Sequence, residues 1–355
     1  GRYAYQAGMM FQASHFADVS GRWGVSFMVW SEGATDPKAD IHVDLKDVPD
    51  GAFAATKIGD KAFYNADGRE ASKWVREPLG TLPGLDAPQM SSGLRVKDGP
   101  GCRGALAPEG LTYLSTNANN PGSGTWVYFV SGPSSCGHGC SVLHGESWRR
   151  AIALYAARKL IAGNWINDKD EYLAPVVSVA YEQWVDDCHV YALLHNSNNC
   201  TAMRNVPYKD KSWTIHNHFF WRTQADTLAA LDTKATGNLY RDCKAHPSKD
   251  VFGNPVVSTP DPYMACVLPS LNLSPEAVNV LTLLDALWVE SLPVRENYAA
   301  GKPELHLVAW DAGVYQAKHL WRDLFPSDWQ ALQAAFRQLA DKLRPGVYEH
   351  GFLKP

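Results

Sequence analysis

A helix start at Ser274 is the feature that most constrains this fold. Serine is a favoured N-cap residue, and Pro275 suits the first helical position, where no intrahelical partner awaits its missing amide hydrogen. The run VNVLTLLDALWV follows with apolar residues at helical spacing. Two later segments, Ala312–Phe325 and Trp329–Leu343, have the same spacing, although LHLVAW at Leu305–Trp310 is strand-like. The sequence therefore predicts a mainly α-helical unit over residues 270–355.

The first part of the chain has strand patterns instead. Its strand candidates are rich in β-branched and aromatic residues and end at turn residues. Proline, glycine, serine and asparagine dominate residues 77–124, which favours loops. We expect a strand-rich, loop-interrupted region over residues 1–143. Its candidate strands are Trp23–Trp30, Ile41–Leu45, Lys61–Asn65, Thr125–Ser131 and the short Leu94–Val96 and Leu111–Leu114.

Residues 144–235 form a mixed region. Trp148–Ile161 has helical apolar spacing, and Ser212–Trp221 suits a strand. The stretches VSVAYEQW and DDCHVYALLH fit either a helix or a strand. Prolines, glycines and weak periodicity predict an irregular linker over residues 236–269. The whole chain is thus expected to be mixed α/β, in the α+β sense.

Composition removes some classes of protein. The 355 residues carry a net charge of −4, which argues against a uniformly basic nucleic-acid binder but allows local basic strips. Apolar runs stop short of a membrane span, so no transmembrane helix is expected. Seven scattered cysteines do not suggest a disulfide framework, and no secretory signal opens the sequence. We therefore expect reduced cysteines and a cytoplasmic location.

The segment Thr201–Arg222 is the best candidate for a nucleic-acid surface. Basic residues alternate there with Tyr208, Trp213 and the FFW run, a combination that suits phosphate contacts and base stacking. A half-buried strand pair with a solvated basic turn explains the same residues equally well. The DNA-binding candidates in this segment are Arg204, Asn205, Lys209, Lys211, Trp213 and Arg222.

A second polar group, NWINDKDEYLAP, follows the helix expected at 148–161. Asn164, Trp165 and Asn167 from this group complete the candidate set, because amide side chains can read base edges. Such residues also cap helices and shape turns. In the DNA interpretation Arg204, Lys209 and Lys211 contact phosphates, and the three asparagines are candidates for base contacts.

The other motifs give weaker indications of function. GPGCRG at Gly99–Gly104 is interpreted as an ordinary turn. Asp261-Pro262-Tyr263 is interpreted as a chance likeness to a catalytic-loop motif. Metal ligands could come from Cys136, His138, Cys140 and His144, but their spacing is unusual for zinc, and no metal is expected. No GxSxG elbow is present.

Four stretches resemble the later part of DNA adenine methyltransferases from restriction-modification and related defence systems. They cover most of the chain: MMFQASHFADVSGRWGVSFMVW, GDKAFYNADGREASKWV, ARKLIAGNWINDKDEYLAP, and the block from DDCHVYALLHNSN to HNHFFW. The resemblance implies that Met9–Trp30 belongs to the late antiparallel strands of a Rossmann-like methyltransferase sheet. The remainder would then be a target-recognition part and a helical unit.

The resemblance also implies S-adenosylmethionine as the cofactor of the intact enzyme and double-stranded DNA as the partner. The glycine-rich cofactor turn and the Asp/Asn-Pro-Pro-aromatic loop are not visible in this sequence, so no residue is assigned a catalytic role. We expect an upstream methyltransferase segment or subunit to supply them. One alternative is a non-catalytic module that binds protein or carbohydrate through its aromatic residues. Another is an enzyme whose site is assembled from scattered residues such as Asp186, Asp187, His189 and His195.

Overall fold

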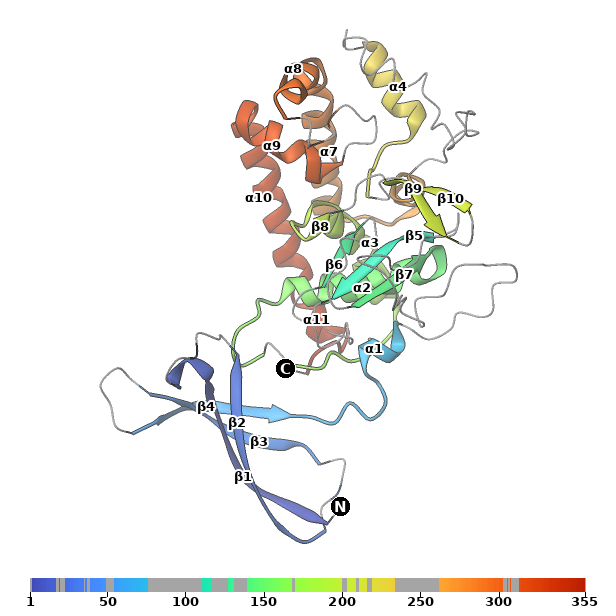
Figure 1. The fold of residues 1–355 in the computed structure, drawn as a ribbon. Helices are drawn as coiled ribbons and strands as arrows, with labels where there is room; N and C mark the ends of the chain where they lie inside the picture. Colours follow the sequence, from blue (N-terminus) through green and yellow to red (C-terminus); the bar gives the residue numbers. More distant parts are fainter. Residues whose placement is uncertain are drawn as a thin grey trace.

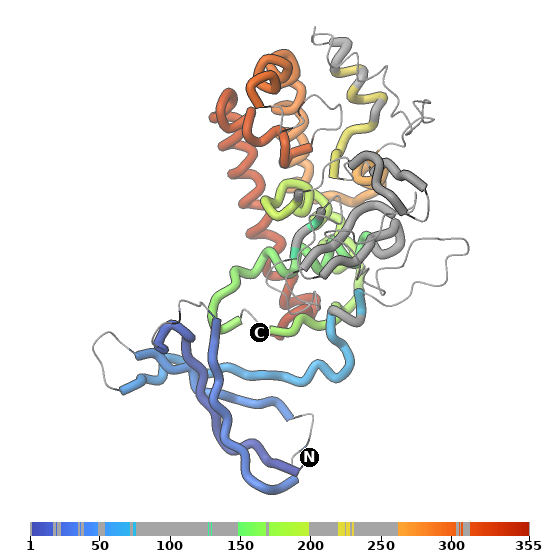
Figure 2. Tube along the Cα trace, viewed as in Figure 1, coloured from blue at the N-terminus to red at the C-terminus, as the bar shows by residue number. Residues whose placement is uncertain are grey.

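The computed structural model is a mixed α/β protein, as the sequence predicts. A four-stranded sheet projects from one end of a larger body of helices and short strands (Figures 1 and 2). The structure describes residues 2–16, 19, 23–34, 36, 39–48, 54–75, 110–116, 127–130, 139–167, 170–199, 203–208, 211–215, 219–233, 262–302, 305, 307 and 313–354.

The projecting sheet has the strand order β2-β1-β3-β4, and its strands are β1 (Tyr3–Gln12), β2 (Gly24–Glu32), β3 (Ile41–Asp47) and β4 (Thr56–Phe63). β1 is antiparallel to β2 and parallel to β3. Strands β2 and β3 match predicted ones, and β4 shares Lys61–Phe63 with the predicted Lys61–Asn65. The residue patterns did not predict β1, although the resemblance implied strands from Met9 onward. A bulge between Tyr5 and Ala7 interrupts its alternation, which removes the period-two signal from the sequence.

A small core holds this sheet against the chain that follows α2. Met10, Val43 and Leu45 are buried, and Trp165 packs against them. Gly24 lies so close to this loop that an added Cβ would be 2.5 Å from the carbonyl oxygen of Trp165. A glycine is therefore required where β2 begins.

A second sheet, of order β7-β5-β6-β8, lies in the body. Its strands are β5 (Gly110–Thr116), β6 (Val127–Val130), β7 (Gly139–His144) and β8 (Asn198–Asn199). The predicted helix follows directly as α2 (Gly145–Leu160). Phe129 packs against Trp148, Tyr155 and Phe219, so an aromatic cluster joins the sheet to α2.

The two ambiguous stretches form one helix, α3 (Val179–Leu194). The Ser178 side chain caps it by accepting a hydrogen bond from the Tyr181 amide. Every residue from Trp184 to Leu194 is buried, because α2, α7 and α10 all pack around this helix. A helix buried on all sides has no polar stripe, which explains why its sequence pattern was ambiguous.

Helices make up most of the described residues after Pro262. Ser274 caps α7 as predicted, with its hydroxyl accepting from the Ala277 amide. By length and composition Pro275–Ala300 could cross a membrane, but it is divided into α7, η5 and α8, and Leu284 and Trp288 of α7 are fully buried. The elements of this unit are α7 (Pro275–Glu290), η5 (Leu292–Val294), α8 (Arg295–Ala300), α9 (Val314–Leu324), α10 (Pro326–Leu343) and α11 (Gly346–Glu349).

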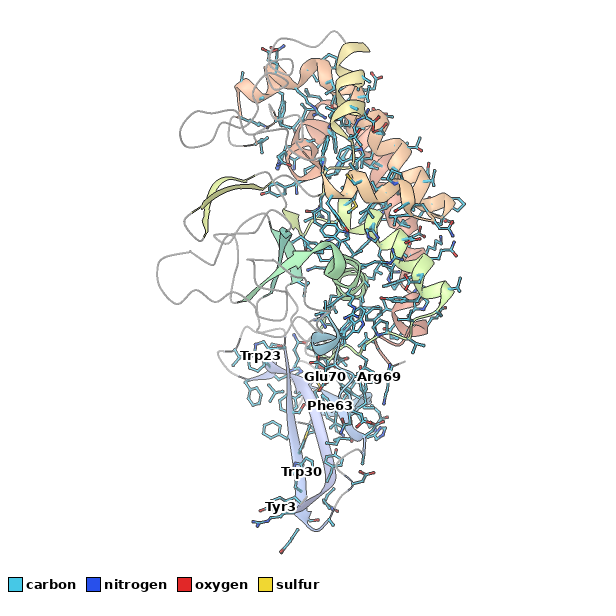
Figure 3. All side chains as sticks on the ribbon, turned by 90° about the vertical axis from the view of Figure 1, so that its right-hand side faces the viewer. Tyr3, Trp23, Trp30, Phe63, Arg69 and Glu70 are labelled. Carbon is cyan, nitrogen blue, oxygen red and sulfur yellow. The ribbon has the colours of Figure 1, made fainter. Side chains whose placement is uncertain are left out.

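An extended segment, residues 170–176, connects the projecting sheet with the body. On one side the Ala71 amide donates to the Tyr172 carbonyl, at the start of the short helix α1 (Ala71–Trp74). On the other side the Leu173 amide donates to the Phe352 carbonyl. Three distant parts of the chain therefore meet at one place, beside the labelled Arg69 and Glu70 in Figure 3.

Three local expectations were wrong. The strand predicted at 212–221 ends at Ile215, and Phe219–Trp221 lie outside any strand because their side chains fill the body core. Leu305 lies in a 3-10 helix and Leu307 in a turn, rather than in a strand. Part of the expected linker is helical and buried: α6 (Tyr263–Val267) and η4 (Leu268–Ser270) belong to the core.

Candidate nucleic-acid interface

The basic and aromatic segment forms a two-stranded antiparallel ribbon. Its strands are β9 (Met203–Tyr208) and β10 (Lys211–Ile215), with Lys211 opposite Tyr208 and Trp213 opposite Val206. Arg204 and Asn205 lie on β9. Lys209 falls between the strands and outside the described residues. A ribbon of this kind is one of the two elements that fit the major groove of DNA.

Arg222 lies in a different environment, inside the helical body. Its side chain is 12% exposed, it forms an ion pair with Asp285, and its guanidinium lies 4.8 Å from the centre of the Trp288 ring. Arg222 also donates to the carbonyl of Asp226, at the start of α4 (Gln224–Thr233). These contacts give Arg222 a structural role and direct its charge away from solvent.

The residues Asn164 and Asn167 form a tight turn through their own side chains. Asn164 Oδ1 accepts from the amides of Ile166 and Asn167, and Asn167 Oδ1 accepts from the Asn164 amide at 2.7 Å. Asn167 Nδ2 donates to the Ala162 carbonyl. The side-chain nitrogen Nδ2 of Asn164, on an exposed side chain, is therefore the group of this turn best placed to reach a base. Trp165 is used in the core of the projecting sheet.

Among the described strands β2 pairs only with β1, and β2 is uncharged from Gly24 to Ser31. Phe27, Val29 and Trp30 on this strand are 49%, 60% and 45% exposed, and Figure 3 shows Trp30 near Tyr3 at the far end of the sheet. The opposite edge, β4, instead carries Lys57 in ion pairs. Charged edges resist strand addition, whereas flat apolar edges invite it.

The acidic residues of α3 hold the helical body together. Asp186 accepts from Arg149 and from the Asn272 amide. Asp187 accepts from the Ser274 amide and pairs with Lys342 of α10 at 3.0 Å. Both carboxylates are therefore occupied by contacts that fix the start of α7 against α3 and α10.

A cluster that the sequence analysis missed lies where α2 and α3 end. Tyr155 is fully buried, and its hydroxyl lies 2.9 Å from Nδ1 of His195. Lys159 follows Tyr155 by one helical turn and is half-buried. Burial lowers the pKa of Lys159 to about 8, and the nearby charge of Arg158 contributes. The spacing of Tyr155 and Lys159 was visible in the sequence, but their proximity to His195 depends on the packing of α2 on α3.

The remaining motifs are placed as follows. Within the described residues no group of three or more His, Cys, Asp and Glu side chains could hold a metal ion. Cys140 and His144 lie on β7, and Cys136 and His138 fall outside the described residues. Gly99–Gly104 also fall outside them. Tyr263, from the Asp261-Pro262-Tyr263 motif, packs edge-on against Trp148 in the core.

No protein-family model, curated protein or solved structure matches this chain.

Proposed function

We propose that this chain is the DNA-recognition portion of an S-adenosylmethionine-dependent DNA adenine methyltransferase of a restriction-modification or defence system, acting in the cytoplasm. The observation that carries the proposal is the β9–β10 ribbon. Arg204 lies on β9 and Lys211 on the paired strand β10, with Trp213 opposite Val206, and Lys209 stands between the two strands in the sequence. The resemblance of four sequence stretches to such enzymes supports the same function.

In this proposal the ribbon enters the major groove of double-stranded DNA. Arg204, Lys209 and Lys211 neutralise phosphates. Asn205 reads a base edge together with the side-chain Nδ2 of Asn164. Arg222 has no part in the contact, because its guanidinium is engaged by Asp285 and Trp288.

The methyl group comes from S-adenosylmethionine held elsewhere. The described residues contain no glycine-rich turn between a strand and a helix, the place where such enzymes hold the cofactor, so no transfer step is assigned to this chain. We propose that the projecting sheet corresponds to the late strands of a Rossmann-like sheet. A methyltransferase segment or subunit would add a strand to β2, whose uncharged edge and exposed Phe27 and Val29 suit that role.

Binding of duplex DNA at several salt concentrations tests the proposal. We expect affinity to fall steeply with salt, because phosphate neutralisation releases counterions. Replacing both Lys209 and Lys211 by alanine should weaken binding and lower the slope of log affinity against log salt by about 2. Arg322→Ala with Arg337→Ala removes the same charge from exposed positions on α9 and α10 and should leave binding unchanged. Absent or salt-independent binding would overturn the proposal.

A second candidate function is a module that binds protein or carbohydrate. It is favoured by the exposed aromatic residues of the projecting sheet, Phe27 and Trp30 above all. This second function would be supported if the chain binds a protein or carbohydrate with an affinity that does not change with salt concentration, and does not bind DNA.

A further inference from the structure

The projecting sheet uses its two faces differently. On the inner face Met10 is buried, and Trp165 packs against the core to which it belongs. Side chains alternate between the faces along a strand, so Met9 and Phe11 belong to the outer face. The residues opposite them on β2 share that face, because directly paired side chains lie on the same side of a sheet. The outer face therefore has an uncharged strip, which we call the outer strip: Ala7, Met9 and Phe11 of β1 with Val25, Phe27 and Val29 of β2.

The outer strip is open to solvent although it is apolar. Met9, Phe27 and Val29 are 45%, 49% and 60% exposed. The ring of Phe11 stacks on that of Phe27, with 5.4 Å between the ring centres and 14° between the planes. At the end of the strip Phe16 lies 5.3 Å from Phe11, centre to centre, and is 42% exposed. Apolar side chains gathered on one face of a sheet are normally buried against a second layer of structure.

Charged side chains border the outer strip on β3 and β4. Asp44 is paired with Met9 in the parallel ladder and therefore shares the outer face. Its carboxylate lies 3.0 Å from Lys46 Nζ and 2.8 Å from Lys57 Nζ, and Lys57 also pairs with Asp60. A second sheet over the outer face would bury this network, at a cost in desolvation. A single helix would not, because the strip is two strands wide, about 10 Å, which matches the diameter of one α-helix.

The size of the outer strip limits what can bind there. Val25 to Val29 span about 14 Å, the length of about nine residues of α-helix. This footprint is far smaller than the roughly 800 Å² that each partner buries in a stable interface, so the strip alone holds neither a lone helix nor a second copy of the chain. The helix must belong to a partner that has a further contact. The strip ends at β2, which among the described strands pairs only with β1 and offers that contact.

We propose that the outer strip binds one amphipathic α-helix of the methyltransferase segment, the same partner that adds a strand to β2. The identity of this partner rests on the proposed function. The helix lies along β1 and β2, with its apolar side on Phe27 and Val29 and its polar residues toward Asp44 and Lys57. Strand addition and helix packing then use adjoining surfaces of the sheet, so each contact strengthens the other.

Titration with a synthetic helix tests the outer strip by NMR. The probe is an amphipathic peptide of about 16 residues, with leucines along one side and lysines and glutamates along the other. A peptide of the same composition with scattered leucines is its control. We expect the signals of Met9, Phe27 and Val29 to move with the amphipathic peptide alone. Binding should be weak, with a dissociation constant on the order of 1 mM, because the peptide lacks the contact with β2.

Two pairs of substitutions show where the peptide binds. Phe27→Gln with Val29→Gln should weaken binding by about tenfold. Val177→Gln with Val179→Gln is the matched control, because these valines are 63% and 89% exposed and lie outside the projecting sheet. Unchanged amide signals of β3 verify that the sheet of each variant is folded. Equal binding of the two peptides, or equal loss in the two variants, would overturn the inference. A dimer of the chain that the Phe27 and Val29 substitutions abolish would also overturn it, by assigning the strip to a second copy.

Duplex DNA separates this inference from the proposed function. Peptide binding at the outer strip in a chain that does not bind DNA would support the strip as a helix-binding surface and reject the proposed function. DNA binding that depends on Lys209 and Lys211, with no response of the strip to the peptide, would do the reverse.

Discussion

Lys61 and Asp170 join the projecting sheet to the rest of the molecule, with Lys61 Nζ lying 2.6 Å from Asp170 Oδ1. Lys61 is on β4, and Asp170 begins the extended segment that runs into the body. The lysine side chain is 9% exposed and the aspartate 21%, so the pair is largely removed from water. An ion pair in such surroundings is costly to break from one side, because the remaining charge stays buried.

Lys61→Ala should therefore destabilise the protein by about 1–3 kcal/mol, less than for a fully buried pair because Asp170 keeps some solvent contact. Chemical denaturation measures the change. Lys57→Ala, on the same strand but 46% exposed, should have little effect. Equal effects of the two substitutions would show that the Lys61–Asp170 pair has no special role.

Gly24→Ala should loosen the projecting sheet. The new Cβ would lie 2.5 Å from the Trp165 carbonyl oxygen, which is backbone and cannot move aside as the end of Met10 can. We expect a loss of about 1–3 kcal/mol and faster amide exchange in β3. At Gly59 of β4 the nearest atom would be 3.6 Å away, so Gly59→Ala should be tolerated. A stable Gly24→Ala protein with unchanged exchange would contradict the close packing of this loop.

Arg222→Met should lower stability without weakening DNA binding by the protein that remains folded. Its ion pair with Asp285 and its stacking on Trp288 are lost together, at a cost of about 1–3 kcal/mol. Thermal unfolding and DNA titration at a temperature where the variant is folded separate the two effects. If the variant has normal stability but reduced DNA affinity, Arg222 contacts DNA after all.

His189 should make the fold sensitive to acid. Burial lowers its pKa to about 4, whereas an unfolded histidine titrates near 6.5. The unfolded state therefore takes up the proton first as pH falls, and the stabilisation present above about pH 6.5 is lost progressively down to about pH 4. His189→Gln should reduce the loss of unfolding free energy between about pH 7 and 4 by about 2–3 kcal/mol. An unchanged pH profile would mean that His189 does not titrate on unfolding.

If a methyltransferase segment adds a strand to β2 as proposed, Val29→Lys should abolish that association. A lysine on the open β2 strand opposes pairing with an apolar strand. Val278→Lys is the matched control, because Val278 is also exposed, at 49%, but lies on α7. Analytical ultracentrifugation of the mixed proteins gives the readout. Equal association of both variants would place the partner elsewhere.

The sequence predicted those elements whose signals are local. The Ser274 cap and the apolar spacing of α2, α7, α9 and α10 are encoded within a few residues, and the structure confirms them. β1 was missed because its bulge interrupts the alternation, and α3 was ambiguous because it is buried all round. Leu305 and Leu307 show the opposite error, since these alternating apolar residues lie in a 3-10 helix and a turn.

The candidate site was less predictable, because a charge in a sequence does not reveal its partner. Arg222 was grouped with Lys209 and Lys211 by proximity in the chain, yet Asp285 engages it across the fold. The contact between Tyr155 and His195 likewise depends on the packing of α2 on α3. Contacts of this kind between distant residues cannot be obtained from composition or periodicity.

The hydrogen bond from Leu173 to Phe352 has a consequence for synthesis. The ribosome makes the projecting sheet, residues 3–63, long before it adds the strip of His350 and Phe352 whose carbonyls hold residues 170–176. At about 5–20 residues per second, the nascent sheet waits on the order of ten seconds or more for this support. During that time its three-residue core is weakly held and the β2 edge is open to other nascent strands. Chaperone demand should therefore be greatest before residue 352 is translated, and a truncation that removes this strip should aggregate through the first sheet.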